Sequence, residues 1–220
     1  MGRRPFYDRR GVTIYHGDCR EILPELMSSV AAVVTDPPYG LRLRGLSKTG
    51  ANAHVRIAGD DTTDLRDWIV RTCRTVLPLI VFGSPKVVRP DRPRGILIWD
   101  KGPSVGMGDL SFPWKPSHEE IYVFGRGWHG HRDPGVLRCL PPHHRGKQRQ
   151  FHPTEKPVAL MRELVKKAPD GAICDPCMGS GSTLLAAREL SRPSIGIEIE
   201  EKYCTVAAQR LTAFEEEWGG

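Results

Sequence analysis

VAAVVTDPPYG, residues 30–40, joins a short apolar run to an acidic turn that contains two prolines. The apolar run over residues 30–34 is typical of a buried strand in a parallel sheet. Because proline cannot continue a sheet ladder, we predict that the strand stops there and presents Asp36 and Tyr39 at its carboxyl end. Ligands of open α/β sheets bind at that end of the strands.

The chemistry of this turn suits a nucleobase that carries an amino group. Asp36 and the carbonyl group of Pro37 are both hydrogen-bond acceptors, and the prolines hold them in a fixed relation. Two such acceptors match an exocyclic amine with two N–H donors, and Tyr39 offers a flat face on which the base can stack. A plain surface turn is the alternative interpretation of this short motif on its own.

A second motif, DPCMGSGS, spans residues 175–182 between a predicted short strand and a predicted helix over residues 183–190. Its glycines let the backbone approach a ligand closely, as in nucleotide-type pockets. It is not a phosphate-binding loop, and its leading Asp175 favours a ligand with a positive amino group. Glu198 ends a predicted strand over residues 194–198, where an acid commonly holds ribose hydroxyl groups. The alternative is a tight strand–helix turn with a capping acid.

Apolar runs and amphipathic segments alternate along the chain, which predicts an α/β fold. Strands predicted at residues 95–99 and 120–124 leave no room for a crossover helix, so we expect an antiparallel pair at one edge of the sheet. Asp18 follows the first predicted strand and is either a helix cap or a ligand contact. A further helix is predicted to have Thr154 as its N-cap and Pro157 within its first turn.

The length of 220 residues suits a single domain over residues 1–220. The net charge of +6 favours a polyanionic partner. Segments 40–61 and 127–152 are basic, and we interpret them as insertions that contact DNA, with a solvated lid as the alternative for the first. Histidines and a cysteine of the second segment match no standard zinc spacing, so we expect no metal; these residues are His129, His131, Cys139, His143 and His144.

No apolar run approaches the ~20 residues that a membrane-spanning helix needs. The first ten residues contain no apolar signal segment, so we expect a cytoplasmic protein that does not bind membranes. The six cysteines are scattered, several of them within apolar runs, and are predicted to be reduced thiols rather than a disulfide framework.

Taken together, the motifs resemble those of the amino-DNA methyltransferases that use S-adenosylmethionine. Residues 36–39 resemble the catalytic tetrapeptide of that family, and residues 175–182 resemble its cofactor loop. Residues 196–198 resemble the ribose-binding strand end, and HPTEKP at residues 152–157 resembles the segment that precedes the cofactor loop. The catalytic motif comes before the cofactor motif, which is the order of the group called beta.

The resemblance implies a doubly wound, mostly parallel, seven-stranded Rossmann-like sheet with one antiparallel strand. It implies that Asp36 and the Pro37 carbonyl group bind the target amine, with Pro38 and Tyr39 completing the catalytic motif. It implies that S-adenosylmethionine is the cofactor, bound by Asp18, Thr154, Lys156, Asp175, Pro176, Cys177, Gly179, Ser180, Gly181 and Glu198.

The implied substrate is double-stranded DNA, whose target base must be flipped out of the helix before reaction. Asp36 favours the N6 amine of adenine, since N4-cytosine enzymes more often begin the tetrapeptide with serine; N4-cytosine is the second choice. A DNA-binding module that keeps the fold without turnover is the non-enzymatic alternative, and methylation of RNA or of protein glutamine is less favoured. The short recognition region is compatible with a homodimer. A separate restriction endonuclease and a stand-alone or phage-type enzyme both stay open.

Overall fold

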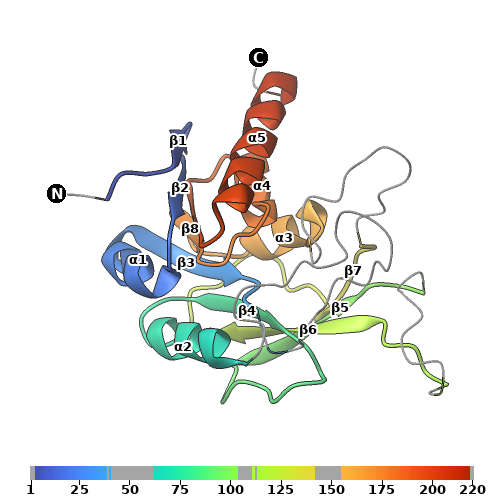
Figure 1. Ribbon diagram of the computed structural model, residues 1–220. Coiled ribbons are helices and arrows are strands. Elements are labelled where there is room, and N and C mark those ends of the chain that lie inside the picture. Colours follow the sequence, from blue (N-terminus) through green and yellow to red (C-terminus); the bar gives the residue numbers. More distant parts are fainter. Residues whose placement is uncertain are drawn as a thin grey trace.

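A nine-stranded mixed sheet runs through the computed structural model, which describes residues 3–38, 40, 62–103, 111, 113–141 and 155–218 (Figure 1). The strand order is β1-β2-β9-β8-β3-β4-β6-β5-β7. The strands are β1 (Tyr7–Arg9), β2 (Val12–His16), β3 (Val30–Thr35), β4 (Leu79–Gly83), β5 (Gly95–Asp100), β6 (His118–Phe124), β7 (Val136–Arg138), β8 (Ala172–Asp175) and β9 (Ser194–Glu198).

The predicted fold class is confirmed, because β2, β9, β8, β3 and β4 are parallel neighbours and β6 is antiparallel to both β4 and β5. Two short strands were not predicted: β1 pairs with β2, and β7 pairs with β5. The antiparallel pair β5 and β6 is therefore present, but β7 and not β5 forms that edge. A strand of three residues is too short to leave a periodic pattern in the sequence, which is why β7 inside segment 127–152 was missed.

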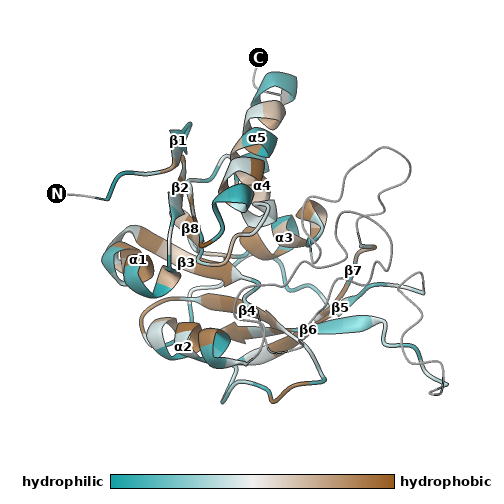
Figure 2. Ribbon diagram, in the orientation of Figure 1, coloured by the Kyte–Doolittle hydropathy of each residue, from teal (hydrophilic) through white to brown (hydrophobic). Residues whose placement is uncertain are grey.

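Helices cover both faces of the sheet (Figure 1). The α1 helix (Cys19–Leu26) and the α2 helix (Asp64–Cys73) pack on one face, and the α3 helix (Val158–Val165) and the α4 helix (Ser182–Glu189) pack on the other. The α5 helix (Glu201–Trp218) packs with α4 against β2. The central strands β3 and β4 are hydrophobic over most of their length because both of their faces are buried (Figure 2).

Prolines behave differently at two helices. Pro24 lies inside α1, which continues to Leu26 and then tightens into a single 3-10 turn over Met27–Ser29. Pro157 was predicted within the first turn of α3, but it is the N-cap residue and has an extended ψ of 130°. The helix therefore begins at Val158. The predicted cap Thr154 lies outside the described residues.

No helix within the described ranges is long and apolar enough to cross a membrane. All six cysteines are free thiols, and Cys19, Cys73, Cys174 and Cys204 are buried.

Candidate active site

Four neighbouring parallel strands carry an acidic residue at or just beyond their carboxyl ends. Asp18 follows β2, Glu198 ends β9, Asp175 ends β8 and Asp36 follows β3. The chain passes from β3 to β4 in one direction across the sheet and from β8 to β9 in the other, so the crevice between β3 and β8 is a topological switch point. The two motifs, far apart in the sequence, therefore meet at a single crevice.

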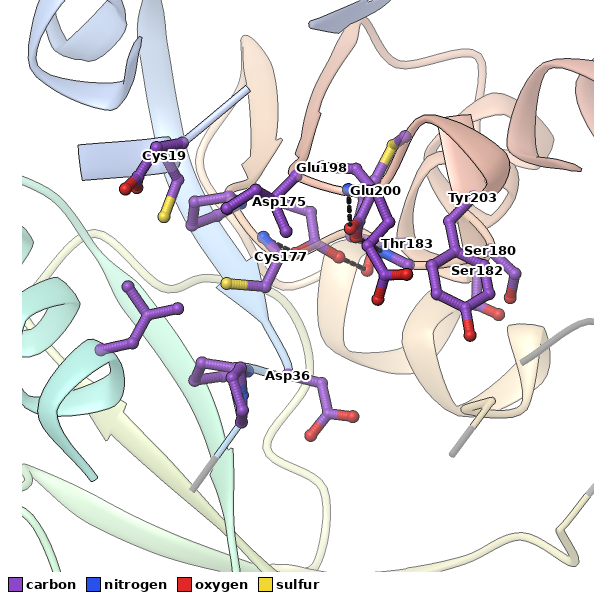
Figure 3. Close-up of a pocket in the computed structure, with 18 of the residues that line it drawn as sticks. Cys19, Asp36, Asp175, Cys177, Ser180, Ser182, Thr183, Glu198, Glu200 and Tyr203 are labelled. Atoms are coloured by element: carbon purple, nitrogen blue, oxygen red, sulfur yellow. Dashed lines mark hydrogen bonds between the residues drawn. The ribbon is translucent and has the colours of Figure 1, made fainter. Parts of the chain in front are cut away.

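A cavity of about 280 Å³ opens at this crevice (Figure 3). Asp36, Pro37 and Pro38 line it from the turn that follows β3. Tyr39, the predicted stacking residue, lies outside the described residues. Most of the predicted cofactor-binding residues also line the cavity: Asp18, Lys156, Asp175, Pro176, Cys177, Gly179, Ser180 and Glu198.

Gly181 is predicted to bind cofactor but does not line the cavity. It is the N-cap residue of α4 and has a φ of 82°, a conformation that favours glycine. A Cβ atom at this position would lie 2.9 Å from the Cβ atom of Ala207 in α5. The structure therefore explains this glycine by the turn and by helix packing.

The cavity is rich in negative charge. Only two basic side chains, Arg20 and Lys156, are among the described residues that line it. Phosphate groups would be repelled there, whereas a ligand with cationic groups would be favoured. Seven acidic residues line the cavity: Asp18, Asp36, Asp64, Glu155, Asp175, Glu198 and Glu200.

Asp175 joins three elements at the floor of the cavity. Its Oδ1 atom accepts hydrogen bonds from the Thr35 hydroxyl group (2.7 Å) and the Cys177 backbone N–H (3.1 Å), and its Oδ2 atom accepts one from Thr183. Burial raises the pKa of Asp175 to about 6, against the effect of these donors. The carboxylate thus ties β3, the glycine-rich loop and α4 together, and its contact with a cofactor stays a prediction.

Glu198 and Asp18 also bind backbone donors. Glu198 accepts hydrogen bonds from the Gly179 N–H (3.0 Å) and the Glu200 N–H (2.9 Å), and burial raises its pKa. Asp18 caps α1 by accepting from the Arg20 N–H (2.8 Å), while its side chain also lines the cavity. Since each carboxylate oxygen has two lone pairs, both residues keep capacity for a ligand.

Asp36 binds a partner that the sequence did not reveal. Its Oδ2 atom lies 2.5 Å from the ammonium group of Lys156, which is 6% exposed and also lies 3.3 Å from Glu119. No described residue donates a hydrogen bond to Asp36 Oδ1, which is buried. Burial raises the pKa of Asp36 to about 6, and the charge of Lys156 opposes that rise. Lys156, predicted to bind cofactor, therefore contacts the predicted catalytic acid.

Arg210 of α5 is a second residue that sequence reasoning missed. Its guanidinium group donates to the Ser180 carbonyl oxygen (2.7 Å) and hydroxyl oxygen (3.0 Å), and it lies 2.7 Å from Glu155 Oε1. It thus ties the glycine-rich loop to the segment that carries Lys156. Amphipathic periodicity gives no signal for such a contact, because it arises from tertiary packing. Ile199 and Tyr203, which line the cavity just beyond Glu198, could have been found from their place after that strand end.

The described residues contain no group of three or more metal-ligating side chains, and His143 and His144 lie outside them.

A family described as DNA methylase matches residues 126–209 of this chain. The Type II methyltransferase M.ScaI of Streptomyces caespitosus is 27% identical over an alignment that covers 96% of this chain and 84% of that protein. The putative methylase YubD of Escherichia coli strain K12 is 28% identical, with 90% of this chain and 89% of that protein covered. The chain is therefore similar to DNA methylases over most of its length.

Solved structures show the same fold for this chain. The complex of M1.HpyAVI with SAM superposes with a TM-score of 0.64 at 24% identity, and covers 91% of this chain and 98% of that one. The cytosine-N4-specific PvuII DNA methyltransferase superposes with a TM-score of 0.67 at 18% identity, and covers 95% and 89% of the two chains.

Proposed function

We propose that this chain transfers a methyl group from S-adenosylmethionine to the exocyclic amine of a base in DNA. The observation that carries the proposal is the meeting of the Asp36 turn and the glycine-rich loop around one acid-lined cavity. The match to the DNA methylase family and the likeness to relatives solved with the same cofactor support it.

The cavity fits S-adenosylmethionine by its charge. The cofactor carries a cationic sulfonium group and a cationic amino group but no phosphate, and the cavity is lined by acids. We propose that Glu198 accepts hydrogen bonds from the ribose hydroxyl groups and that Asp18 contacts the adenine end. Ile199 and Tyr203 give that end of the cavity apolar surface. When bound, the cofactor supplies a methyl group on a sulfur atom that accepts the electron pair of the broken carbon–sulfur bond.

The protein prepares the target nitrogen for attack. The lone pair of an exocyclic amine is delocalised into the base, so hydrogen bonds from its two N–H groups to Asp36 Oδ1 and the Pro37 carbonyl oxygen favour a pyramidal nitrogen. The carboxylate also stabilises the positive charge that grows on this nitrogen. Asp36 need not be a strong base, because the methylated nitrogen is acidic and loses its proton readily to solvent. Holding both reactants at one crevice supplies much of the remaining acceleration.

We propose adenine N6 as the target, because the turn begins with an aspartate. Cytosine N4 is the second candidate, since a cytosine-N4-specific enzyme has the same fold. Duplex DNA is the proposed substrate, and the target base is flipped into the cavity. The homodimer, the partner nuclease, the single-domain boundaries and the cytoplasmic location stay predictions. So does the DNA contact of segments 40–61 and 127–152, much of which lies outside the described residues.

Nucleoside mass spectrometry tests the proposal directly. Purified protein is incubated with S-adenosylmethionine and mixed-sequence duplex DNA, which is then digested to nucleosides. We expect N6-methyladenine, at a level that depends on added cofactor. N4-methylcytosine would keep the mechanism and change the base, whereas the absence of both products would contradict the proposal.

A further inference from the structure

Four charged side chains of alternating sign lead away from the catalytic turn. The Lys156 ammonium group lies between Asp36 Oδ2 at 2.5 Å and Glu119 Oε2 at 3.3 Å. Glu119 Oε1 in turn accepts a hydrogen bond from the ammonium group of Lys101. We call Asp36, Lys156, Glu119 and Lys101 the charge chain. It is electrically neutral when all four groups are ionised, and it joins β3, the segment before α3, and the β5–β6 pair.

Aromatic rings enclose the charge chain. The Lys156 ammonium group lies 5.1 Å from the centre of the Phe82 ring and 5.8 Å from that of Trp99, and Lys101 lies 4.8 Å from the Trp99 ring. Trp99 and Glu119 are paired in the β5–β6 ladder, so the sheet itself fixes the ring beside the carboxylate. Aromatic faces attract cations, and the partial exclusion of water strengthens each charge interaction.

We propose that Lys156 and Glu119 are positioning residues for Asp36, holding its carboxylate ionised with Oδ2 engaged and Oδ1 left to accept from the target amine. This inference rests on the proposed function. Lys156 binds Oδ2, and the carboxylate of Glu119 balances the positive charge of Lys156. Without Glu119, the ammonium group would place an uncompensated positive charge near a nitrogen that itself becomes positive.

The charges around Asp36 explain why it needs such support. Burial and the carboxylates of Glu119 and Asp175 all favour its neutral form, while Lys156 favours the ionised form. A protonated Asp36 would lose the negative charge that stabilises the attacking nitrogen. Lys156 therefore sets the pH range in which the site works.

The test separates this role from the cofactor contact that the family resemblance implies for Lys156. Lys156→Met, Lys156→Arg and Glu119→Gln are compared with wild type in two measurements: the pH profile of kcat/KM and the calorimetric Kd for S-adenosylmethionine. Lys166→Met is the matched control, because the Lys166 side chain is exposed and pairs with Glu163 three residues earlier.

For Lys156→Met we expect the acidic limb of the kcat/KM profile to shift toward higher pH by about one unit or more. Activity should then fall by roughly 3-fold or more at pH 6.5 and recover to about the wild-type level at pH 9. Lys156→Arg keeps the positive charge and should leave the limb in place. Glu119→Gln should move the limb down, because it removes a negative charge near Asp36. The Kd for the cofactor should change by less than about 3-fold in all of these variants.

Two results would overturn the inference. One is a limb that stays in place in both Lys156→Met and Glu119→Gln. The other is a cofactor Kd that weakens by about 10-fold in Lys156→Met, which would make Lys156 a cofactor ligand. If wild type has no DNA methyltransferase activity, the proposed function fails by itself. The carboxyl pKa of Asp36, measured by carbon-13 NMR, must still rise in Lys156→Met and fall in Glu119→Gln for this inference to stand.

Discussion

The two oxygens of the Asp36 carboxylate differ in their partners. Oδ2 binds Lys156, and Oδ1 receives no hydrogen bond from any described residue. Leaving a buried acceptor unpaired usually costs about 1–3 kcal/mol, and such sites often belong to a function that completes them. The unsatisfied oxygen is therefore an argument for a ligand that donates a hydrogen bond at this point.

Replacing Asp36 by alanine should abolish turnover while sparing cofactor binding. We expect kcat to fall by about 10²–10³-fold or more, the usual effect of removing one preorganised group that stabilises transition-state charge. The Kd for S-adenosylmethionine should stay within about 3-fold of wild type. Asp91→Ala, on a carboxylate 72% exposed and outside both basic segments, is the control and should keep full activity. An Asp36→Ala enzyme that retains most of its activity would remove Asp36 from the mechanism.

Asp175 should give the protein a measurable pH dependence of stability. Burial raises its pKa from 3.8 to about 6, so between these values the folded state holds a proton that the unfolded chain has released. The stabilising contribution of this group is therefore lost as the pH rises. Relative to Asp175→Asn, wild type should lose on the order of 1 kcal/mol of unfolding free energy between pH 5 and pH 7.5. Urea unfolding at both pH values measures this, and a difference of the opposite sign would contradict the raised pKa.

Site residues could be predicted from the sequence where they lie in a local motif. Asp36, Asp175 and Glu198 each stand at the end of an apolar run, so parallel-strand geometry brings them together without further information. Lys156 lies in the HPTEKP motif and Glu119 just before a predicted strand, but neither pattern indicates their contact with each other or with Asp36. That contact depends on the order in which the strands pair. Pairwise tertiary contacts of this kind leave no trace in composition or periodicity.

At the scale of elements, β9 and α4 approach closely at Gly196. A Cβ atom there would lie 2.3 Å from Met178 Sδ and 2.9 Å from Leu184 Cδ2. Gly196→Ala should therefore destabilise the fold by about 1–3 kcal/mol through overpacking. Gly95, at the start of β5, has open space around the same position, so Gly95→Ala should stay within about 0.5 kcal/mol of wild type. Thermal unfolding compares the two variants, and equal melting temperatures would show that the Met178 and Leu184 side chains can move aside without cost.

The long buried strands could be predicted from the hydrophobic pattern of the sequence, whereas the short strands at the edges of the sheet could not. Buried strands such as β3 and β4 are predictable because both of their faces exclude water, so nearly every residue is apolar. The β1 and β7 strands have exposed residues and span three positions each, and only pairing with a neighbour defines them. Helix ends shifted by a few residues, as at α3, which begins at Val158 rather than just after the predicted cap Thr154.

For the whole molecule, the net charge of +6 should dominate the salt dependence of DNA binding. Each phosphate that the protein neutralises releases counterions, so log K should fall linearly with log salt concentration. Affinity for duplex DNA, measured by fluorescence anisotropy between 50 and 200 mM salt, should drop by about 10-fold or more. Affinity for the cofactor over the same range should change little, because its cavity is partly screened from bulk ions. A DNA affinity that does not change with salt concentration would contradict a binding surface made of basic side chains.

Glu155 and Lys156 are adjacent in the chain, and they pair with different parts of the site. Glu155 pairs with Arg210, which also binds the glycine-rich loop, and Lys156 pairs with Asp36, the acid that we propose binds the target base. We expect this shared peptide unit to link the binding of the two ligands thermodynamically. The factor by which bound DNA changes the affinity for the cofactor must equal the factor by which bound cofactor changes the affinity for DNA. Each ligand should thus report on the occupancy of the other, and a loosened Glu155 should uncouple them before it weakens either one.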